Sequence, residues 1–440
     1  MIVIEDTKLS FSRYLSKIYE DQCGELKVNS PYCKTFTFQV TEDCNLRCSY
    51  CYQIHKTPNK MTLEMGKKIV DCIFRDNYKI EKYYSLQSMT GIILEFIGGE
   101  PFLEVDLIDN IMDYFVEQAY KYKSILAYKY RISISSNGTL YNDPKVQAFI
   151  KKWRDKLSLG ISLDGCKELH DTCRVFPDGS GSYDLAVDAA KKELQINPYM
   201  STKMTLSPDN IKYFLPAIKN LIELGYKDIP CNYVFEKGWT LDDAIKAYTY
   251  IKDVADYLLT LNRIPNISFF NQSCARSVSK NYDSNWCGGT GLMLSANYKG
   301  EFYPCIRYME SSLGTEVPPY IIGNVDDGIM NTEDSCNKIN CLTCITMSSQ
   351  STKECMNCPI NALCAWCSGY NYQEFGTPNK RATYICDMHK ARVLGNIYFW
   401  NKLFRINGSK NRLKLPLDDE SCLKIIDNKE LSLLRELEKE

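Results

Sequence analysis

The sequence predicts an α/β protein in which a parallel sheet with covering helices is followed by a cysteine-rich domain. Strand-like and helix-like patterns alternate six times between residues 34 and 265, which is typical of successive β/α units. Beyond them the regular elements become short, and eleven of the 21 cysteines lie between Cys274 and Cys386. We therefore expect an N-terminal extension at 1–33, a sheet domain at 34–265, a cysteine-rich domain at 266–390 and a helical tail at 391–440.

The six units are read from residue patterns. Expected strands lie at 35–40, 92–97, 131–136, 157–163, 200–206 and 229–235. Expected helices follow them at 62–73 with Thr62 as the cap, and at 105–120, 144–153, 183–194, 211–224 and 241–261. Right-handed crossovers let six such units curl into a full or partial (β/α)6 barrel. In barrels of this kind the chemistry lies on the loops at the C-terminal ends of the strands.

Composition excludes several classes of protein. Lys and Arg number 53 against 54 Asp and Glu, so the net charge of −1 does not suggest a nucleic-acid partner. No apolar run approaches the ~20 residues that span a bilayer. The N-terminus has acidic residues where a signal peptide needs a basic start, so we expect no membrane partner and a cytoplasmic location.

The cysteine content points to metal. A large chain in a reducing compartment keeps its thiols reduced, so many cysteines favour metal sites over disulfides. Only three histidines are present, which favours metal held by sulfur, as iron–sulfur clusters or zinc. Seven scattered cysteines are expected to be small buried hydrophobic residues. They are Cys23, Cys33, Cys72, Cys166, Cys173, Cys231 and Cys422.

Cys44, Cys48 and Cys51 lie within eight residues, directly after the first expected strand. A cluster of four irons needs four ligands, so three thiolates leave one iron open for a small molecule. The alternative is a structural zinc site, which requires four closed ligands. His55 is the nearby residue that could supply the fourth.

Groups suited to a small ligand also follow the next three strands. They are Gly98, Gly99, Glu100 and Pro101 after the second strand, Ser136 and Asn137 after the third, Asp164 after the fourth, and Arg174 a short way on. Two glycines let a ligand approach the backbone closely. Arg174 could pair with a carboxylate in a planar fork. Each group alone would be a simple turn or a solvated surface residue, but together they predict one ligand site.

These residues resemble the motifs of the radical S-adenosylmethionine (radical SAM) superfamily over about residues 34–265. The cysteine triad, with Tyr50 before its third cysteine, resembles that family's cluster motif. Residues 98–101 resemble its GGEP motif, which holds the amino group of the SAM methionine. Ser136 and Asn137 lie where the family contacts ribose and carboxylate, and Arg174 where related members contact the SAM carboxylate.

The resemblance implies a partial (β/α)6 radical SAM barrel, with SAM and one 4Fe–4S cluster as cofactors. It implies a 5′-deoxyadenosyl radical that takes a hydrogen from an unactivated carbon. A flavodoxin- or ferredoxin-type partner would supply the electron. The cofactor performs the difficult step in such enzymes, and the protein positions it and excludes side reactions.

Residues 266–390 resemble the SPASM domain, which binds auxiliary clusters in enzymes that modify peptides. By this resemblance, one auxiliary 4Fe–4S cluster is held by Cys355, Cys358, Cys364 and Cys386. A second is held by Cys287, Cys305 and Cys367, with Cys274 or an open site as fourth ligand. Only two residues separate Cys364 from Cys367 where the family usually has three, which weakens the assignment of Cys367.

Three further cysteines, Cys336, Cys341 and Cys344, are surplus to the SPASM pattern. They could bind zinc, feed a cluster or hold nothing. A domain organised wholly by zinc ribbons is the alternative for this region, and the upstream triad argues against it.

SPASM proteins act mainly on peptides, so the resemblance implies a ribosomally made precursor peptide as substrate and a thioether from a cysteine sulfur to a carbon as product. An anaerobic sulfatase-maturing (formylglycine-forming) enzyme or a peptide epimerase is the alternative within enzymes. A non-catalytic iron–sulfur electron carrier is the alternative outside them. Asp164, Glu236 and Tyr233 are equal candidates for a catalytic acid or base. The 43 residues before Cys44 are too few for a complete leader-recognition domain, so leader binding is expected to use residues 1–33, the C-terminal helices or a separate protein.

Overall fold

The computed structural model describes residues 2–4, 33–85, 90–275, 287, 289, 291–361, 364 and 366–439, with the backbone alone at 3, 4, 274 and 275. Four parallel strands follow one another in the main sheet: β2 (Cys33–Gln39), β3 (Gly91–Ile97), β4 (Tyr130–Ser136) and β5 (Leu157–Ile161). Their aromatic and aliphatic side chains alternate, so one face of the sheet packs in the core under the helices. The first four expected strands are confirmed.

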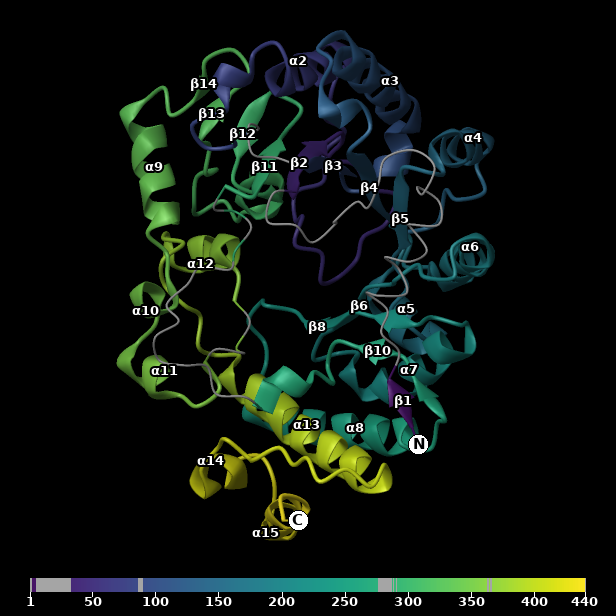
Figure 1. Cartoon of the computed structure of the whole chain (residues 1–440), viewed down its shortest axis with the longest axis vertical. Helices are drawn as coiled ribbons and strands as arrows, with labels where there is room; N and C mark the ends of the chain where they lie inside the picture. The colour runs from purple at the N-terminus through teal and green to yellow at the C-terminus, as the bar shows by residue number, and fades with distance from the viewer. Residues whose placement is uncertain are drawn as a thin grey trace.

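Helices connect the strands and lie on the outside of the arc that they form (Figure 1). They are α2 (Leu63–Ile73), α3 (Val105–Lys121), α4 (Pro144–Trp153), α5 (Lys167–Cys173), α6 (Tyr183–Ile196), α7 (Phe214–Glu223) and α8 (Leu241–Leu258). Thr62 caps α2 as predicted, since its Oγ1 accepts from the Met65 N–H at 3.1 Å. The expected helix at 211–224 begins as a 3-10 turn, η4 (Ile211–Tyr213), before α7. The sequence pattern did not predict α5.

The last two expected strands are shorter than predicted. β6 (Met204–Leu206) pairs in parallel with β8 (Cys231–Tyr233), and β7 (Asp228–Ile229) pairs with β10 (Asn266–Ile267). Pro230 separates β7 from β8, because proline has no N–H to continue a ladder. Among the described strands no ladder joins β5 to β6. Thr202 crosses this gap, accepting from the Leu163 N–H and donating toward the carbonyls of Ile161 and Leu163.

A β-hairpin in the cysteine-rich segment extends the barrel sheet. β11 (Met293–Ala296) turns through Gly300, at φ +79°, into the antiparallel β12 (Glu301–Tyr303). β11 also pairs in parallel with β2, and β13 (Gly323–Asn324) and β14 (Gly328–Ile329) follow β12. The cysteine-rich segment therefore shares a sheet with the barrel. A further strand pair is β1 (Val3–Ile4) with β9 (Arg263–Ile264).

The described elements after β14 are helices. Short helices lie among the later cysteines: α9 (Glu333–Thr343), α10 (Met347–Gln350), α11 (Lys353–Asn357) and α12 (Ser368–Phe375). Short 3-10 turns are η1 (Asn77–Lys79), η2 (Pro101–Glu104), η3 (Ile125–Ala127), η5 (Gln272–Ala275), η6 (Ile306–Tyr308) and η7 (Glu310–Ser312). The helical C-terminus is confirmed as α13 (Cys386–Ile406), α14 (Asp419–Leu423) and α15 (Asn428–Leu437).

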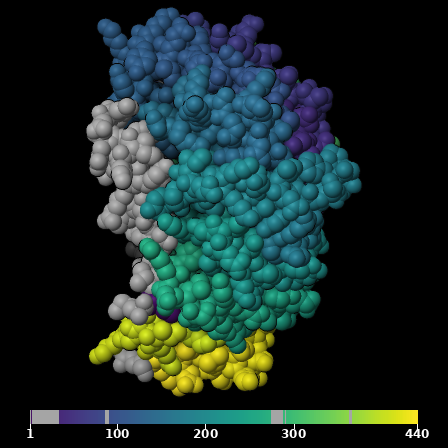
Figure 2. Space-filling view, turned by 90° about the vertical axis from the view of Figure 1, so that its right-hand side faces the viewer, coloured from purple at the N-terminus to yellow at the C-terminus, as the bar shows by residue number. Residues whose placement is uncertain are grey.

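Helix α13 anchors the C-terminus to the barrel. It packs along α8, where Gly395 lies so close that an added Cβ would stand 2.4 Å from Ile251. Figure 2 shows the C-terminal residues, in yellow, at the lower end of the molecule beneath the later barrel segments. No helix of the described residues is both long enough and apolar enough to cross a membrane.

Candidate active site

The cysteine triad lies on the loop after β2, and this loop is held against the segment after α5. The Ser49 N–H donates to the Cys173 carbonyl at 2.9 Å, and the Arg47 N–H donates to the Val175 carbonyl at 2.7 Å. Burial raises the pKa of the Cys48 thiol to about 11, and the neighbouring Cys51 and Cys44 raise it further. The three thiols are therefore near enough to interact electrostatically. A bound cation would favour their thiolate forms.

The GGEP segment lies directly against the cysteine loop. An added Cβ on Gly99 would stand 2.3 Å from the Asp43 carbonyl oxygen and 2.5 Å from Cys44 Cβ. On Gly98 it would stand 2.6 Å from the Thr41 carbonyl oxygen. The two glycines are therefore required for the two loops to touch. The sequence suggested instead that they let a ligand approach the backbone, but this contact between the loops explains the absence of side chains more directly. Pro101 begins η2.

Glu100 ties three loops together. Its carboxylate accepts from Ser136 Oγ and from the Asn137 N–H, both at 2.8 Å, and from the Phe102 N–H at 3.1 Å. Its own N–H donates to the Asp43 carbonyl at 2.9 Å. Burial raises the pKa of Glu100 to about 7, although these hydrogen bonds oppose the change.

The raised pKa of Glu100 predicts a pH-dependent stability. Because the folded state holds its proton more tightly than the unfolded chain, this contribution is complete below the unfolded pKa of 4.5 and is lost as the pH rises through about 7. The loss is on the order of 3 kcal/mol. We expect the thermal midpoint, measured anaerobically, to fall between pH 5 and pH 8. Glu100→Gln should flatten this dependence, and an equally steep profile in that variant would refute the assignment.

Ser136 and Asn137 extend the same network toward the cysteines. Asn137 Nδ2 donates to Asn45 Oδ1 at 2.8 Å and lies 4.0 Å from Cys44 Sγ. Thr139 Oγ1 donates to Asn137 Oδ1 at 2.6 Å and accepts from Asn45 Nδ2 at 2.7 Å. The structure thus brings together the three residue groups that follow β2, β3 and β4, as the sequence predicted.

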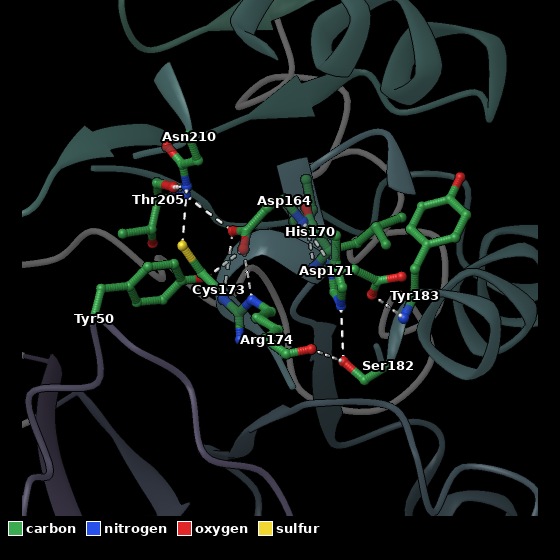
Figure 3. Close-up of polar contacts among 12 residues, drawn as sticks. Tyr50, Asp164, His170, Asp171, Cys173, Arg174, Ser182, Tyr183, Thr205 and Asn210 are labelled. Atoms are coloured by element: carbon green, nitrogen blue, oxygen red, sulfur yellow. Dashed lines mark hydrogen bonds and ion pairs between the residues drawn. The ribbon is translucent and has the colours of Figure 1, made fainter. Parts of the chain in front are cut away.

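Asp164 and Arg174 form a buried ion pair (Figure 3). Arg174 Nε donates to Asp164 Oδ2 at 2.7 Å and Nη2 to Oδ1 at 3.4 Å. The Tyr50 hydroxyl also donates to Asp164 Oδ2, and the Tyr50 ring lies 5.4 Å from the guanidinium. The planar fork expected for Arg174 is therefore formed with a carboxylate of the chain itself.

Electrostatics keep Asp164 ionised. Burial alone would raise its pKa, but the charge of Arg174 and hydrogen bonds from Arg174 and Tyr50 hold the pKa below its usual value. The Thr205 N–H also donates to Asp164 Oδ1 at 3.0 Å. Asp164 thus joins the loop after β5 to β6 across the open edge of the barrel.

Sequence reasoning missed the residues that support this pair. His170 is fully buried, and burial lowers its pKa to about 3, so its ring is neutral. The Asp164 N–H donates to His170 Nδ1 at 3.3 Å, so Nε2 carries the proton and donates to Ser182 Oγ at 3.0 Å. Ser182 Oγ then donates to the Arg174 carbonyl at 2.8 Å. No motif in the sequence marks His170 or Ser182.

The C-terminal cysteines gather in two groups. A cavity of about 560 Å³ is lined by the first group, Cys355, Cys358, Cys364 and Cys386. In the second group, Cys367 and Cys287 add to burial in raising the pKa of the Cys305 thiol. Cys287 Sγ lies 3.1 Å from Ser368 Oγ, beside Cys367. The side chain of Cys274 lies outside the described residues. Both groups join cysteines far apart in sequence, in the combinations that the resemblance implied.

The surplus cysteines do not form a third group of this kind. Cys336 donates to the Met330 carbonyl, Cys341 lies beside Tyr320, and Cys344 is exposed. Cys336 and Cys341 are about 140° apart around α9. Within the described ranges no three Cys, His, Asp or Glu side chains are close enough to hold a single metal ion, and this includes the triad and the two C-terminal groups. His55 Nε2 lies 3.0 Å from the Leu313 carbonyl oxygen, in a separate pocket.

The scattered cysteines behave mostly as expected. Cys72, Cys166, Cys173, Cys231 and Cys422 are buried. Cys33 is half-buried. Cys23 lies outside the described residues.

The barrel mouth and the second cysteine group are joined by a cluster around Arg307. Both Nη atoms of Arg307 donate to Glu236 Oε1, at 3.2 and 3.1 Å. The guanidinium lies 5.0 Å from the Tyr52 ring and 5.6 Å from the Tyr370 ring. Tyr384 donates to the Phe235 carbonyl, so two successive residues of the loop after β8 contact the cysteine-rich segment.

The three candidates for a catalytic acid or base differ in their surroundings. Tyr233 is buried among the rings of Trp239 and Phe269, and its hydroxyl has no hydrogen-bond partner among the described residues. Asp164 is occupied by Arg174. Glu236 is 39% exposed in its side chain, and no described partner contacts its Oε2. Of the three, only Glu236 keeps a free carboxylate oxygen at the barrel mouth.

Comparison with known proteins agrees with this geometry. Residues 38–251 match the model of the radical SAM superfamily. The chain is 24% identical over 402 residues to the radical SAM cyclopropyl synthase TigE of Paramaledivibacter caminithermalis, covering 84% of this chain and 75% of TigE. It is 25% identical over 383 residues to the subtilosin biosynthesis protein AlbA of Bacillus subtilis, covering 82% and 72%.

A cysteine-type anaerobic sulfatase-maturating enzyme of Clostridium perfringens is 23% identical over 349 residues, covering 74% of this chain and 85% of that enzyme. The solved structure of anSMEcpe with bound AdoMet and the Cp18Cys peptide superposes with a TM-score of 0.61 at 20% identity. It covers 86% of this chain and 99% of that one, and it supports the fold alone. The cysteine triad, the GGEP segment and the parallel strands that bring them together therefore belong to a radical SAM domain at residues 38–251, and the chain is an enzyme that carries this domain.

Proposed function

We propose that this enzyme modifies a ribosomally made peptide by joining a cysteine sulfur to a carbon as a thioether. The observation that carries the proposal is the second cysteine group, Cys287, Cys305 and Cys367, at the mouth of the barrel. A group with three protein thiols would leave room for a substrate thiolate, a soft ligand suited to iron. Two relatives, TigE and AlbA, are named for a synthase and for bacteriocin biosynthesis, which supports a peptide substrate.

The residues at the triad fit a 4Fe–4S cluster and SAM. Cys44, Cys48 and Cys51 supply three soft ligands, and the buried Glu100, Ser136 and Asn137 supply polar groups beside them. Both auxiliary clusters would likewise be held by the two C-terminal cysteine groups, the first of which already encloses a cavity. When bound, SAM and the triad cluster supply a carbon-centred radical that removes a hydrogen atom from the substrate.

The chain's own residues hold and shield this chemistry. Glu100 fixes the loops after β2 and β4 against each other, so the cysteines and Asn137 keep one geometry. The Asp164–Arg174 pair closes the barrel between β5 and β6. Arg307 and Tyr52 hold the mouth of the barrel against the cysteine-rich segment, which limits the access of water to a reactive intermediate.

A mass spectrum tests the proposal. The enzyme is co-expressed anaerobically with the small cysteine-containing peptide encoded beside its gene. We expect the peptide to lose two hydrogen atoms per cross-link, and fragmentation to place each bond at a cysteine. Cys48→Ala should abolish the change because it removes a ligand of the triad. Cys422→Ala, a buried cysteine of α14, is the matched control and should retain it.

An unchanged peptide mass would reject this pairing and favour the second candidate, formylglycine formation. The match to the Clostridium perfringens enzyme supports that candidate. A sulfatase-derived peptide would then lose the cysteine sulfur and gain an aldehyde. Epimerisation would instead incorporate deuterium from deuterated water at unchanged bond connectivity. A non-catalytic electron carrier would fail to cleave SAM under any of these conditions.

A further inference from the structure

A cavity of about 490 Å³ lies where the chain around the cysteine triad meets the cysteine-rich segment. One wall comes from residues on either side of the triad, namely Glu42, His55, Thr57 and Asn59. The opposite wall comes from the turn between β11 and β12 and from residues between 310 and 319. The His55 N–H donates to the Ser311 carbonyl at 3.1 Å, and Asn59 Nδ2 donates to the Tyr298 hydroxyl at 2.9 Å, so the two walls are held together. The proposed reaction gives this cavity no role.

Glu42 is the buried charge of the lining. The residue is only 6% exposed, and its Oε2 accepts from Thr57 Oγ1 at 2.5 Å and from Asn59 Nδ2 at 3.2 Å. Among the described residues nothing donates to its Oε1, and no lysine or arginine lies within ion-pair distance of it. A carboxylate taken out of water is costly unless a cation offsets its charge. The cavity therefore has one oxygen that suits a cationic donor.

The remaining charges of the lining are paired with each other. Lys299 Nζ lies 3.1 Å from Glu310 Oε2, which leaves Glu42 as the carboxylate of the lining without a counter-charge. His55 Nε2 donates to the Leu313 carbonyl at 3.0 Å. Asn59 is held through its amide nitrogen, and none of the described groups donates to its Oδ1. Glu42 and Asn59 thus offer two acceptor oxygens on the same wall.

Part of the lining is apolar. It includes Leu313, Val317, Pro318 and Pro319. Lysine and arginine lay their methylene stems along such surfaces while the charged end meets a polar partner. A small inorganic cation would make no use of this surface, and the described side chains supply no set of three ligands for a metal ion. The lining therefore fits a long cationic side chain better than a free ion.

We propose that this cavity binds a lysine or arginine side chain of the precursor peptide, which donates to Glu42 Oε1 and Asn59 Oδ1 and packs its stem on the apolar part of the lining. Glu42 lies two residues before Cys44, and Ser311 six residues after Cys305. The bound side chain would thus contact the two chain segments that carry the triad and the second cysteine group. This inference rests on the proposed peptide substrate, and it adds that the peptide needs a basic residue besides its cysteines.

Binding of the fluorescently labelled precursor peptide to the anaerobic holoenzyme tests the cavity. We expect Glu42→Gln to raise the Kd by about ten- to a hundredfold, the range of a hydrogen bond between charged groups. Glutamine keeps an oxygen that accepts from Thr57 and Asn59, so the loop should keep its fold, and iron content and thermal midpoint verify this. Glu64→Gln, at an exposed acid in the first turn of α2, is the matched control and should bind as the parent does.

A scan of the peptide identifies the bound residue. Each lysine and arginine of the peptide is changed in turn to methionine. One change should weaken binding to the parent by a similar factor but leave binding to Glu42→Gln nearly unchanged, because both substitutions remove the same interaction. Effects that multiply at every position, or an unchanged Kd in Glu42→Gln, would overturn the inference.

Two further readouts separate this inference from its alternatives. If the effect of Glu42→Gln disappears when Na⁺ and K⁺ are replaced by a bulky organic cation, the cavity holds an inorganic ion and the inference is wrong. The peptide mass is measured in parallel. A peptide that is modified but binds independently of Glu42 rejects this inference alone, whereas a peptide that binds through Glu42 but is not modified rejects only the proposed function.

Discussion

Replacing Arg174 with leucine is expected to destabilise the protein by about 3–5 kcal/mol, because it leaves the carboxylate of Asp164 buried without its partner. The side chain of Asp164 is 0% exposed and that of Arg174 is 11% exposed. Tyr50 and Thr205 would still donate to Asp164, but neither carries a compensating charge. The loop after β5 and the edge of β6 should loosen together. Thermal and urea unfolding of the parent and variant measure the loss.

An exposed ion pair on the neighbouring helices provides the control. Lys167 and Asp184 are 53% and 78% exposed in their side chains, and such pairs contribute at most about 1 kcal/mol. Lys167→Leu should therefore change the unfolding free energy several times less than Arg174→Leu. Equal effects of the two substitutions would mean that burial does not control the strength of the Asp164 pair.

Replacing Cys364 with alanine is expected to remove about four iron atoms per chain while leaving the triad cluster in place. Cys364 is buried in the four-cysteine cavity, where Cys386 and Cys358 also raise its pKa. Because Cys386 is the first residue of α13, loss of the cluster should also lower the thermal midpoint. Iron analysis and electron paramagnetic resonance of the reduced protein measure the result.

Cys336→Ala is the matched control for this substitution. Cys336, which lies on α9, donates to the Met330 carbonyl and does not line the four-cysteine cavity. Its replacement should leave the iron content unchanged. An iron content in Cys364→Ala equal to that of the parent would reject the auxiliary cluster at this cavity, and a loss in Cys336→Ala would assign metal to the surplus cysteines.

The cysteine triad and the segment around Glu100 could be predicted because each is a motif of a few consecutive residues. The spacing of Cys44, Cys48 and Cys51, and the glycines before Glu100, mark loops that follow strands with clear β-branched and aromatic patterns. The first four strands and most helices follow for the same reason. The last two strands were predicted too long because Pro230 and the side-chain bridge of Thr202 interrupt pairing, and hydrophobic pattern does not report pairing.

The remainder depended on partners distant in sequence. The guanidinium of Arg174 was expected to pair with a carboxylate, and folding brings the carboxylate of Asp164 to it, with His170 and Ser182 behind. The free oxygen of Glu236 became distinguishable only when Arg307, 71 residues later, was seen to take the other one. Likewise, β11 joins the edge of β2, so the cysteine-rich segment extends the barrel sheet rather than standing apart.

The sequence by itself determined the β/α order and the radical SAM motifs, and by resemblance it indicated how the cysteines are grouped. Each of these depends on the spacing of residues along the chain. Only the tertiary structure decided which charges are paired and which are buried, as in the ion pair of Asp164 and Arg174. The physical reason is that burial and electrostatic interaction depend on all the neighbours of a group. Those neighbours come from several strands and loops that the chain brings together only on folding.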